Sequence, residues 1–144
     1  MVGRETEMVH TANNRLRVLL ADDEERWHQT ARGLLEPQGV QTVSARSGRE
    51  ALDILRREAI HVAVLDYRMP QIGGLQVIRL LREQRSRSPV PPAILLADDL
   101  NPQVMHEALG ASIFSVLGKP VDLNVLLGTL ARVLQRHYSG RWPD

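Results

Sequence analysis

The sequence contains no cysteine, so the chain forms no disulfide bond and offers no thiolate to a metal ion. This composition suits a reducing compartment, and we expect the protein in the cytoplasm. No apolar run approaches the roughly 18 residues that mark a membrane-spanning helix, so we expect no membrane insertion. The net charge is only +1, and the basic residues are scattered over several expected helices, which argues against direct nucleic-acid binding.

Lysine is almost absent as well. The chain has 18 lysine and arginine residues, and its single lysine is Lys119. Because arginine supplies the general surface charge, the one position that keeps lysine favours a compact, flexible point charge over a planar guanidinium. Retention by chance is the alternative interpretation.

Short apolar runs predict five strands. They occupy residues 16–21, 40–44, 62–65, 93–97 and 113–117. Continuous runs of this length are typical of strands that are buried on both faces. Because a helical pattern follows each run, the chain predicts one α/β domain with a parallel sheet and right-handed crossovers.

Helix signals and composition set the expected boundaries. Ser47 and Glu50 match a capping box, and Asn101 with Pro102 matches the start of another helix. We expect a disordered leader over residues 1–14, the domain over 15–138 and a short tail over 139–144.

The last predicted helix, residues 122–137, is apolar around much of its circumference. This exceeds the single stripe that a helix turns toward its own core. The excess predicts a partner or homodimer surface on the fourth and fifth helices, and we expect Leu127 and Leu134 to lie on it.

Polar side chains stand where four of the predicted strands end. They are Asp22 and Asp23, Asp66, Asp98 and Asp99, and Lys119. Open parallel sheets bind ligands beyond the carboxyl ends of their strands. If the first, third and fifth strand ends converge, three carboxylates and one ammonium share a pocket. Acids this crowded require a cation, and their hard oxygen ligands favour Mg²⁺. The competing interpretation is that the acids only cap the helices that follow.

These residues, in this order and at this spacing, resemble the receiver domain of two-component response regulators, in particular single-domain chemotaxis regulators. The matching features are the Asp22-Asp23 pair, the D-x-x-M-P-x-x-x-G run from Asp66 to Gly74, and Lys119-Pro120. The resemblance covers about residues 16–137. It implies a flavodoxin-like (βα)5 fold, a doubly wound parallel five-stranded sheet with strand order 2-1-3-4-5.

The resemblance also implies roles for these residues. Asp66 would accept a phosphoryl group from a sensor histidine kinase or phosphotransfer protein, and the domain would signal to a downstream protein. Asp23, Asp66 and the Arg68 backbone carbonyl would hold Mg²⁺ directly, and Asp22 largely through water. Lys119 would contact the phosphoryl oxygens, and the peptide bond that follows it would be cis. Such a domain is a phosphoacceptor and not an enzyme, apart from Mg²⁺-dependent self-phosphorylation and autodephosphorylation.

Three positions depart from the family's pattern. Ala97 stands where the family has serine or threonine, Asp98 where it has a small residue, and Val116 where it has an aromatic residue. The resemblance therefore predicts a complete acidic pocket with a degraded relay to the far surface. A receiver-like interaction module whose output is independent of phosphorylation is the alternative.

Two enzyme or nucleotide-binding classes fit less well. Aspartyl-phosphate phosphatases of the haloacid dehalogenase type need a second acid two residues after the nucleophile, where this chain has Arg68. A dinucleotide-binding domain needs glycines after its first strand, but the turn here reads ADDEERW, whose acids would repel a pyrophosphate.

Overall fold

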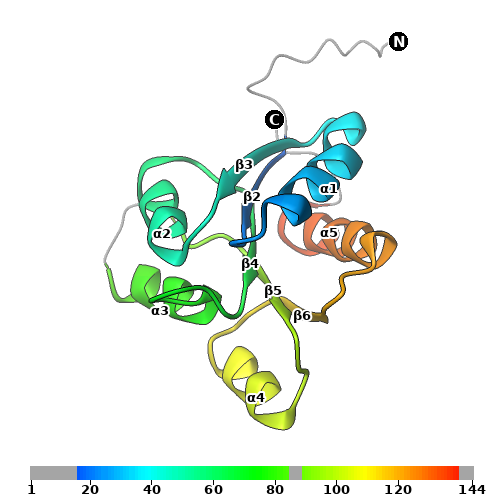
Figure 1. The fold of residues 1–144 in the computed structure, drawn as a ribbon. Helices are drawn as coiled ribbons and strands as arrows, with labels where there is room; N and C mark the ends of the chain where they lie inside the picture. The colour runs from blue at the N-terminus through cyan, green and yellow to red at the C-terminus, as the bar shows by residue number, and fades with distance from the viewer. Residues whose placement is uncertain (1–15, 85–88, 140–144) are drawn as a thin grey trace.

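The computed structural model describes residues 16–84 and 89–139. The leader expected over residues 1–14 lies outside the described residues, as does all of the expected tail except Ser139. The described strands are β2 (Arg17–Ala21), β3 (Gln41–Ala45), β4 (Val62–Asp66), β5 (Ala93–Ala97) and β6 (Ser115–Gly118). They form one parallel sheet in the order β3-β2-β4-β5-β6 (Figure 1). This is the order 2-1-3-4-5 along the chain, so the predicted fold is confirmed.

Helices cover both faces of the sheet (Figure 1). They are α1 (Glu25–Leu35), which continues into the short 3-10 helix η2 (Glu36–Gln38), α2 (Gly48–Arg57), α3 (Gly74–Glu83), α4 (Pro102–Gly110) and α5 (Leu123–His137). Helices α1 and α5 pack on one face, and α2, α3 and α4 pack on the other.

Two hydrophobic clusters, one on each face, hold these layers together. Alternate residues of one strand enter opposite clusters because successive side chains of a strand point to opposite faces. In β2, Val18 and Leu20 belong to the cluster with α1 and α5, whereas Leu19 belongs to the cluster with α2 and α3. Strands β4 and β5 are buried along their whole length, as their continuous apolar runs predict. No helix in the described ranges is long and apolar enough to cross a membrane.

The predicted helix starts are largely confirmed. The Asn101 side chain accepts a hydrogen bond from the Val104 backbone N–H at 2.9 Å, and Pro102 is the first residue of α4. The Ser47 hydroxyl accepts from the Glu50 N–H at 3.1 Å. The return bond of the capping box is displaced by one residue, because the Glu50 carboxylate accepts from the N–H of Arg46 at 2.7 Å.

The expectation that Leu134 lies on a partner surface is wrong, while the same expectation for Leu127, which is only partly buried, stays a prediction. Leu134 is buried, and Leu127 packs against the same cluster, because α5 contacts the sheet on one side and α1 on another. The exposed large apolar side chains of the described residues are Leu100, Met105, Leu109 and Val125. Exposed apolar area is therefore concentrated on and just before α4, and we call Leu100, Met105 and Leu109 the α4 apolar surface.

Candidate functional site

The site lies at the carboxyl edge of the sheet, where the strands β2, β4 and β6 end. Asp66 is the last residue of β4, while Asp22 and Lys119 directly follow β2 and β6. The sheet hydrogen bonds extend to these two residues: the Asp22 N–H donates to the Ala45 carbonyl at 3.1 Å, and the Lys119 N–H donates to the Ala97 carbonyl at 2.9 Å. The neighbouring strands thus fix the backbone of these two candidate site residues.

The side chains at this edge meet as the strand order predicts. The Lys119 ammonium lies 2.7 Å from Oδ2 of Asp66 and 3.4 Å from Oδ2 of Asp22. One carboxylate oxygen each of Asp22, Asp23 and Asp66 lies within 4.8 Å of the other two. Asp22 and Asp66 are buried, whereas Asp23 is exposed to solvent.

Burial and neighbouring charges shift the pKa values of Asp66 and Lys119. Burial raises the pKa of Asp66 and the Asp22 charge adds to this, while the hydrogen bond from Lys119 opposes it. Burial alone would lower the pKa of Lys119, but its hydrogen bond to Asp66 and the charge of Asp22 raise it. The site therefore keeps a protonated amine beside carboxylates that outnumber it.

The donor set fits a hard divalent cation. Oδ1 of Asp22 accepts a hydrogen bond from the Glu24 N–H at 2.9 Å. Oδ2 of the same side chain is buried and has no hydrogen-bond partner among the described residues, although the Lys119 ammonium lies nearby. A buried carboxylate oxygen without a hydrogen bond is costly. Together with the other two carboxylates, it can serve as an oxygen ligand for a cation such as Mg²⁺.

A buried histidine, not identified from the sequence, supports the backbone of the acidic pair. His28 of α1 is completely buried, and its Nε2 donates a hydrogen bond to the Asp22 carbonyl at 2.8 Å. Because a carbonyl can only accept, Nε2 carries the proton of this bond, while Nδ1 lies within hydrogen-bond distance of the Ser44 hydroxyl, at 3.2 Å. Six residues separate His28 from Asp22 in the sequence, and no motif marks this spacing.

Two glycines let the loop after Asp66 fold back on itself. A Cβ on Gly73 would lie 2.1 Å from the Tyr67 carbonyl oxygen, and one on Gly74 would lie 2.7 Å from the Asp66 carbonyl oxygen. The same loop approaches α2, since a Cβ on Gly48 would lie 2.0 Å from the Ile72 carbonyl oxygen. The glycine of the D-x-x-M-P-x-x-x-G run is therefore required by close backbone packing.

Tyr67 extends from this loop to α4. Its hydroxyl donates a hydrogen bond to Oε1 of Glu107 at 2.7 Å, and this bond raises the pKa of Tyr67. The Arg68 guanidinium carbon lies 5.9 Å from the centre of the Tyr67 ring. Within the described part of the chain, no ion pair joins Arg68 to an acid of the β5–α4 loop.

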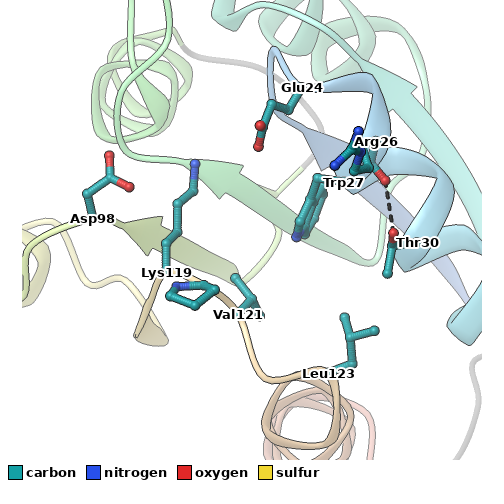
Figure 2. Close-up of a pocket in the computed structure, with 9 residues that line it drawn as sticks. Glu24, Arg26, Trp27, Thr30, Asp98, Lys119, Val121 and Leu123 are labelled. Atoms are coloured by element: carbon teal, nitrogen blue, oxygen red, sulfur yellow. Dashed lines mark hydrogen bonds between the residues drawn. The ribbon is translucent and has the colours of Figure 1, made fainter.

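The three departures from the family pattern are visible in the structure. Ala97 is buried at the end of β5, so no hydroxyl stands there, and Val116 of β6 packs against the cluster under α2 and α3. Asp98 is exposed and lines a cavity of about 460 Å³ together with Lys119 and Trp27. Figure 2 shows the Lys119 side chain extended between Asp98 and Trp27.

Comparison with known proteins gives a consistent assignment. The model of the response regulator receiver domain family matches residues 18–131. Response regulator MprA of Mycolicibacterium vanbaalenii is 33% identical over 122 residues, which are 84% of this chain and 51% of MprA. The CAI-1 autoinducer sensor kinase/phosphatase CqsS of Vibrio cholerae serotype O1 is 30% identical over 115 residues, which are 80% of this chain and 17% of CqsS. The chain thus spans about half or less of the length of these relatives.

Solved structures of receiver domains have the same fold. The receiver domain of the Francisella response regulator 1452 aligns with a TM-score of 0.77 at 27% identity, covering 85% of this chain and 98% of that one. The chemotaxis response regulator CheY4 of Vibrio cholerae aligns with a TM-score of 0.75 at 28% identity, covering 83% of this chain and 99% of that one. Sequence, fold and site agree, and the chain belongs to the response regulator receiver domain family of two-component systems.

Proposed function

We propose that this receiver domain is phosphorylated on Asp66 by a sensor histidine kinase or phosphotransfer protein and signals through protein contacts. The proposal is carried by one observation: a buried carboxylate ends the central strand β4 and is hydrogen-bonded to the chain's single lysine at 2.7 Å. An acid and an ammonium in this arrangement suit transfer of a phosphoryl group. The absence of cysteine is consistent with a cytoplasmic setting.

In the proposed reaction, a carboxylate oxygen of Asp66 forms a bond to phosphorus. The phosphorus–nitrogen bond of the donor's phosphohistidine breaks, and the electron pair returns to the imidazole nitrogen. The Lys119 ammonium then contacts the phosphoryl oxygens and balances part of their charge. We propose that the domain is a phosphoacceptor and not an enzyme, apart from Mg²⁺-dependent self-phosphorylation and autodephosphorylation.

We propose that Asp23, Asp66 and the Arg68 carbonyl hold Mg²⁺ directly, and that Asp22 acts largely through water. Support comes from the three clustered carboxylates and from the buried Asp22 oxygen without a hydrogen bond. When bound, Mg²⁺ supplies positive charge that stabilises the phosphoryl oxygens. The sheet hydrogen bond at the Asp22 backbone orients this acid before any ion binds.

The output is proposed to be a protein contact with a downstream protein or a second copy of the chain, made through the α4 apolar surface and the exposed Val125 of α5. The exposed leucines and methionine of this surface support the proposal. Ala97 and Val116 favour a second candidate, an interaction module whose output does not depend on phosphorylation.

Phosphorylation is tested by incubating the protein with Mg²⁺ and acetyl phosphate and measuring its intact mass. We expect the mass of one added phosphoryl group on the wild type and none on Asp66→Asn. Asp99→Asn, which changes an exposed acid after β5, is the matched control and should be labelled normally. Labelling of Asp66→Asn would place the chemistry elsewhere, and an unlabelled wild type would favour the second candidate.

The metal site is tested separately by titration calorimetry with Mg²⁺ alone. Asp23→Ala should weaken Mg²⁺ binding strongly, while Asp99→Asn should leave it unchanged. Equal affinity of Asp23→Ala and wild type would mean that the ligand set is misassigned.

A further inference from the structure

Helix α4 is attached to the rest of the domain by little apolar contact. Of its residues, only Val104 and Ala108 are buried, while Met105 and Leu109 are exposed at 45% and 79%. A helix with so little buried apolar area gains little from the hydrophobic effect. Its position on the sheet depends more on polar contacts than that of the other helices.

Among the described residues, two side chains from other parts of the domain, those of Arg82 and Tyr67, donate hydrogen bonds to α4 or to the residue that ends it. At its carboxyl end, the Arg82 guanidinium of α3 donates to the carbonyl of Ala111. In its middle, the Glu107 carboxylate accepts the 2.7 Å hydrogen bond from Tyr67. Arg82 lies far from the acidic pocket in sequence, whereas Tyr67 directly follows Asp66.

The backbone around Tyr67 is tightly held. Its N–H donates to the Leu96 carbonyl of β5 at 2.7 Å, and its carbonyl lies against Gly73. A cavity of about 180 Å³ lies beside the Tyr67 and Glu107 side chains. A change at Asp66 that displaces this backbone therefore moves the rigid tyrosine ring, and the cavity leaves Glu107 space to follow.

We infer that Tyr67 is a positioning residue that couples the state of Asp66 to helix α4 through its hydrogen bond with Glu107. This route needs neither a hydroxyl at Ala97 nor an aromatic ring at Val116. It rests on the proposed phosphorylation of Asp66 and names the contact through which the α4 apolar surface responds. Glu107 is two residues from both Met105 and Leu109 and therefore lies on the opposite side of α4 from them. A shift at Glu107 moves the α4 apolar surface because it moves the helix that carries it.

The decisive variant is Tyr67→Phe, which removes the hydroxyl and keeps the ring. Amide chemical shifts are recorded with Mg²⁺, with and without beryllofluoride as the phosphoryl analogue. In the wild type we expect shifts around Asp66 and Lys119 and also along α4. In Tyr67→Phe the shifts at the pocket should persist and those along α4 should largely disappear. Without the analogue, hydrogen exchange of α4 amides should be about tenfold faster, because the hydrogen bond lost is one to a charged acceptor.

Three further variants separate coupling from simple loosening of the helix. Glu107→Ala should behave like Tyr67→Phe, whereas Glu107→Gln keeps an acceptor oxygen and should restore the α4 response. Arg82→Leu removes the contact that does not lead to Asp66. It should speed exchange in α4 but leave the beryllofluoride response of α4 in place.

The outcomes are distinguishable. If Tyr67→Phe keeps the full α4 response, or if wild-type α4 does not respond while the pocket does, the coupling is wrong. If beryllofluoride produces no shift even around Asp66 of the wild type, the proposed phosphorylation fails and the coupling fails with it. If the α4 amides of Tyr67→Phe exchange at the wild-type rate without the analogue, the hydrogen bond to Glu107 does not hold α4. The inference is then wrong whatever the beryllofluoride response.

Discussion

Helices α3 and α4 cover the same face of the sheet, but different interactions hold them. Helix α3 buries five residues, Gly74, Leu75, Val77, Ile78 and Leu81, whereas α4 buries two. Apolar burial anchors α3 to the core, while α4 relies on a hydrogen bond from Tyr67 and another from Arg82. Segments with few buried apolar contacts open at lower free energy than the core. On this face, α4 is therefore the element that can rearrange while the sheet stays folded.

The largest expected effect comes from removing one anchor of α3. Ile78 is completely buried and Met105 of α4 is 45% exposed. Ile78→Ala should lower the free energy of unfolding by about 2–5 kcal/mol, whereas Met105→Ala should change it by no more than about 0.5 kcal/mol. Urea denaturation measures both. Similar losses in the two variants would mean that α4 is anchored as firmly as α3.

A buried polar anchor should have an intermediate effect. His28→Leu leaves the Asp22 carbonyl and the Ser44 hydroxyl without their partner, which should lower the free energy of unfolding by about 1–3 kcal/mol. His106→Leu, at an exposed position of α4, is the control and should be nearly neutral. Urea denaturation measures the stability of both variants. If they are equally stable, His28 does not anchor the Asp22 backbone.

The helix caps give a smaller effect that separates local from global opening. Ser47→Ala and Asn101→Ala each remove an N-cap, at a cost of about 1 kcal/mol. Amides of α4 should exchange about fivefold faster in Asn101→Ala and be unaffected by Ser47→Ala, because α4 opens on its own. Amides of α2 exchange through global unfolding and should respond to both. If the α4 amides also exchange faster in Ser47→Ala, α4 does not open separately from the rest of the domain.

The smallest effect is expected from pH. Nδ1 of His61 accepts the Arg17 N–H at 2.8 Å, and burial, with the charge of Arg17, lowers the pKa of His61. The unfolded chain thus binds a proton more readily than the folded one, with an unfolded pKa of about 6.5. Stability should be unaffected above that pH, decline as the pH falls from about 6.5 toward the lower pKa of the folded state, and change no further below that pKa. Urea midpoints between about pH 7.5 and 5 measure the decline, and His61→Gln should remove it without altering α4 exchange. An unchanged decline in that variant would assign it to another group.

Much of the fold follows from local sequence pattern. Buried strands produce continuous apolar runs, and the strand ends place Asp22, Asp66 and Lys119 at one edge. A predicted boundary is wrong where residues with the pattern of one element belong to the end of the preceding element. The run at 113–117 predicts a strand starting at Ile113, but the Ile113 N–H donates to the Ala108 carbonyl at 3.0 Å. That bond closes the end of α4, and β6 begins at Ser115 instead.

The sequence does not reveal which side chains of different helices and loops contact one another. The hydrogen bond between Tyr67 and Glu107 and that between His28 and Asp22 depend on which helix face meets which loop. The same limitation explains the error at Leu134. An apolar helix circumference does not indicate how many neighbours surround it, and α5 has both the sheet and α1.

The packing of the loop after Asp66 has a consequence for tolerance to substitution. Gly48 and Gly73 face backbone oxygens at distances that leave no room for a methyl group, while Gly110 and Gly128 have nothing within 4 Å of the added carbon. Alanine should be accepted at the two helical positions of α4 and α5, where it favours the helix over glycine. A population of variants selected only for folding would therefore lose glycine freely at 110 and 128 and keep it at 48 and 73. Selection for folding alone would thus preserve glycine at two positions of close packing near Asp66, Gly73 within the loop and Gly48 of α2 against it.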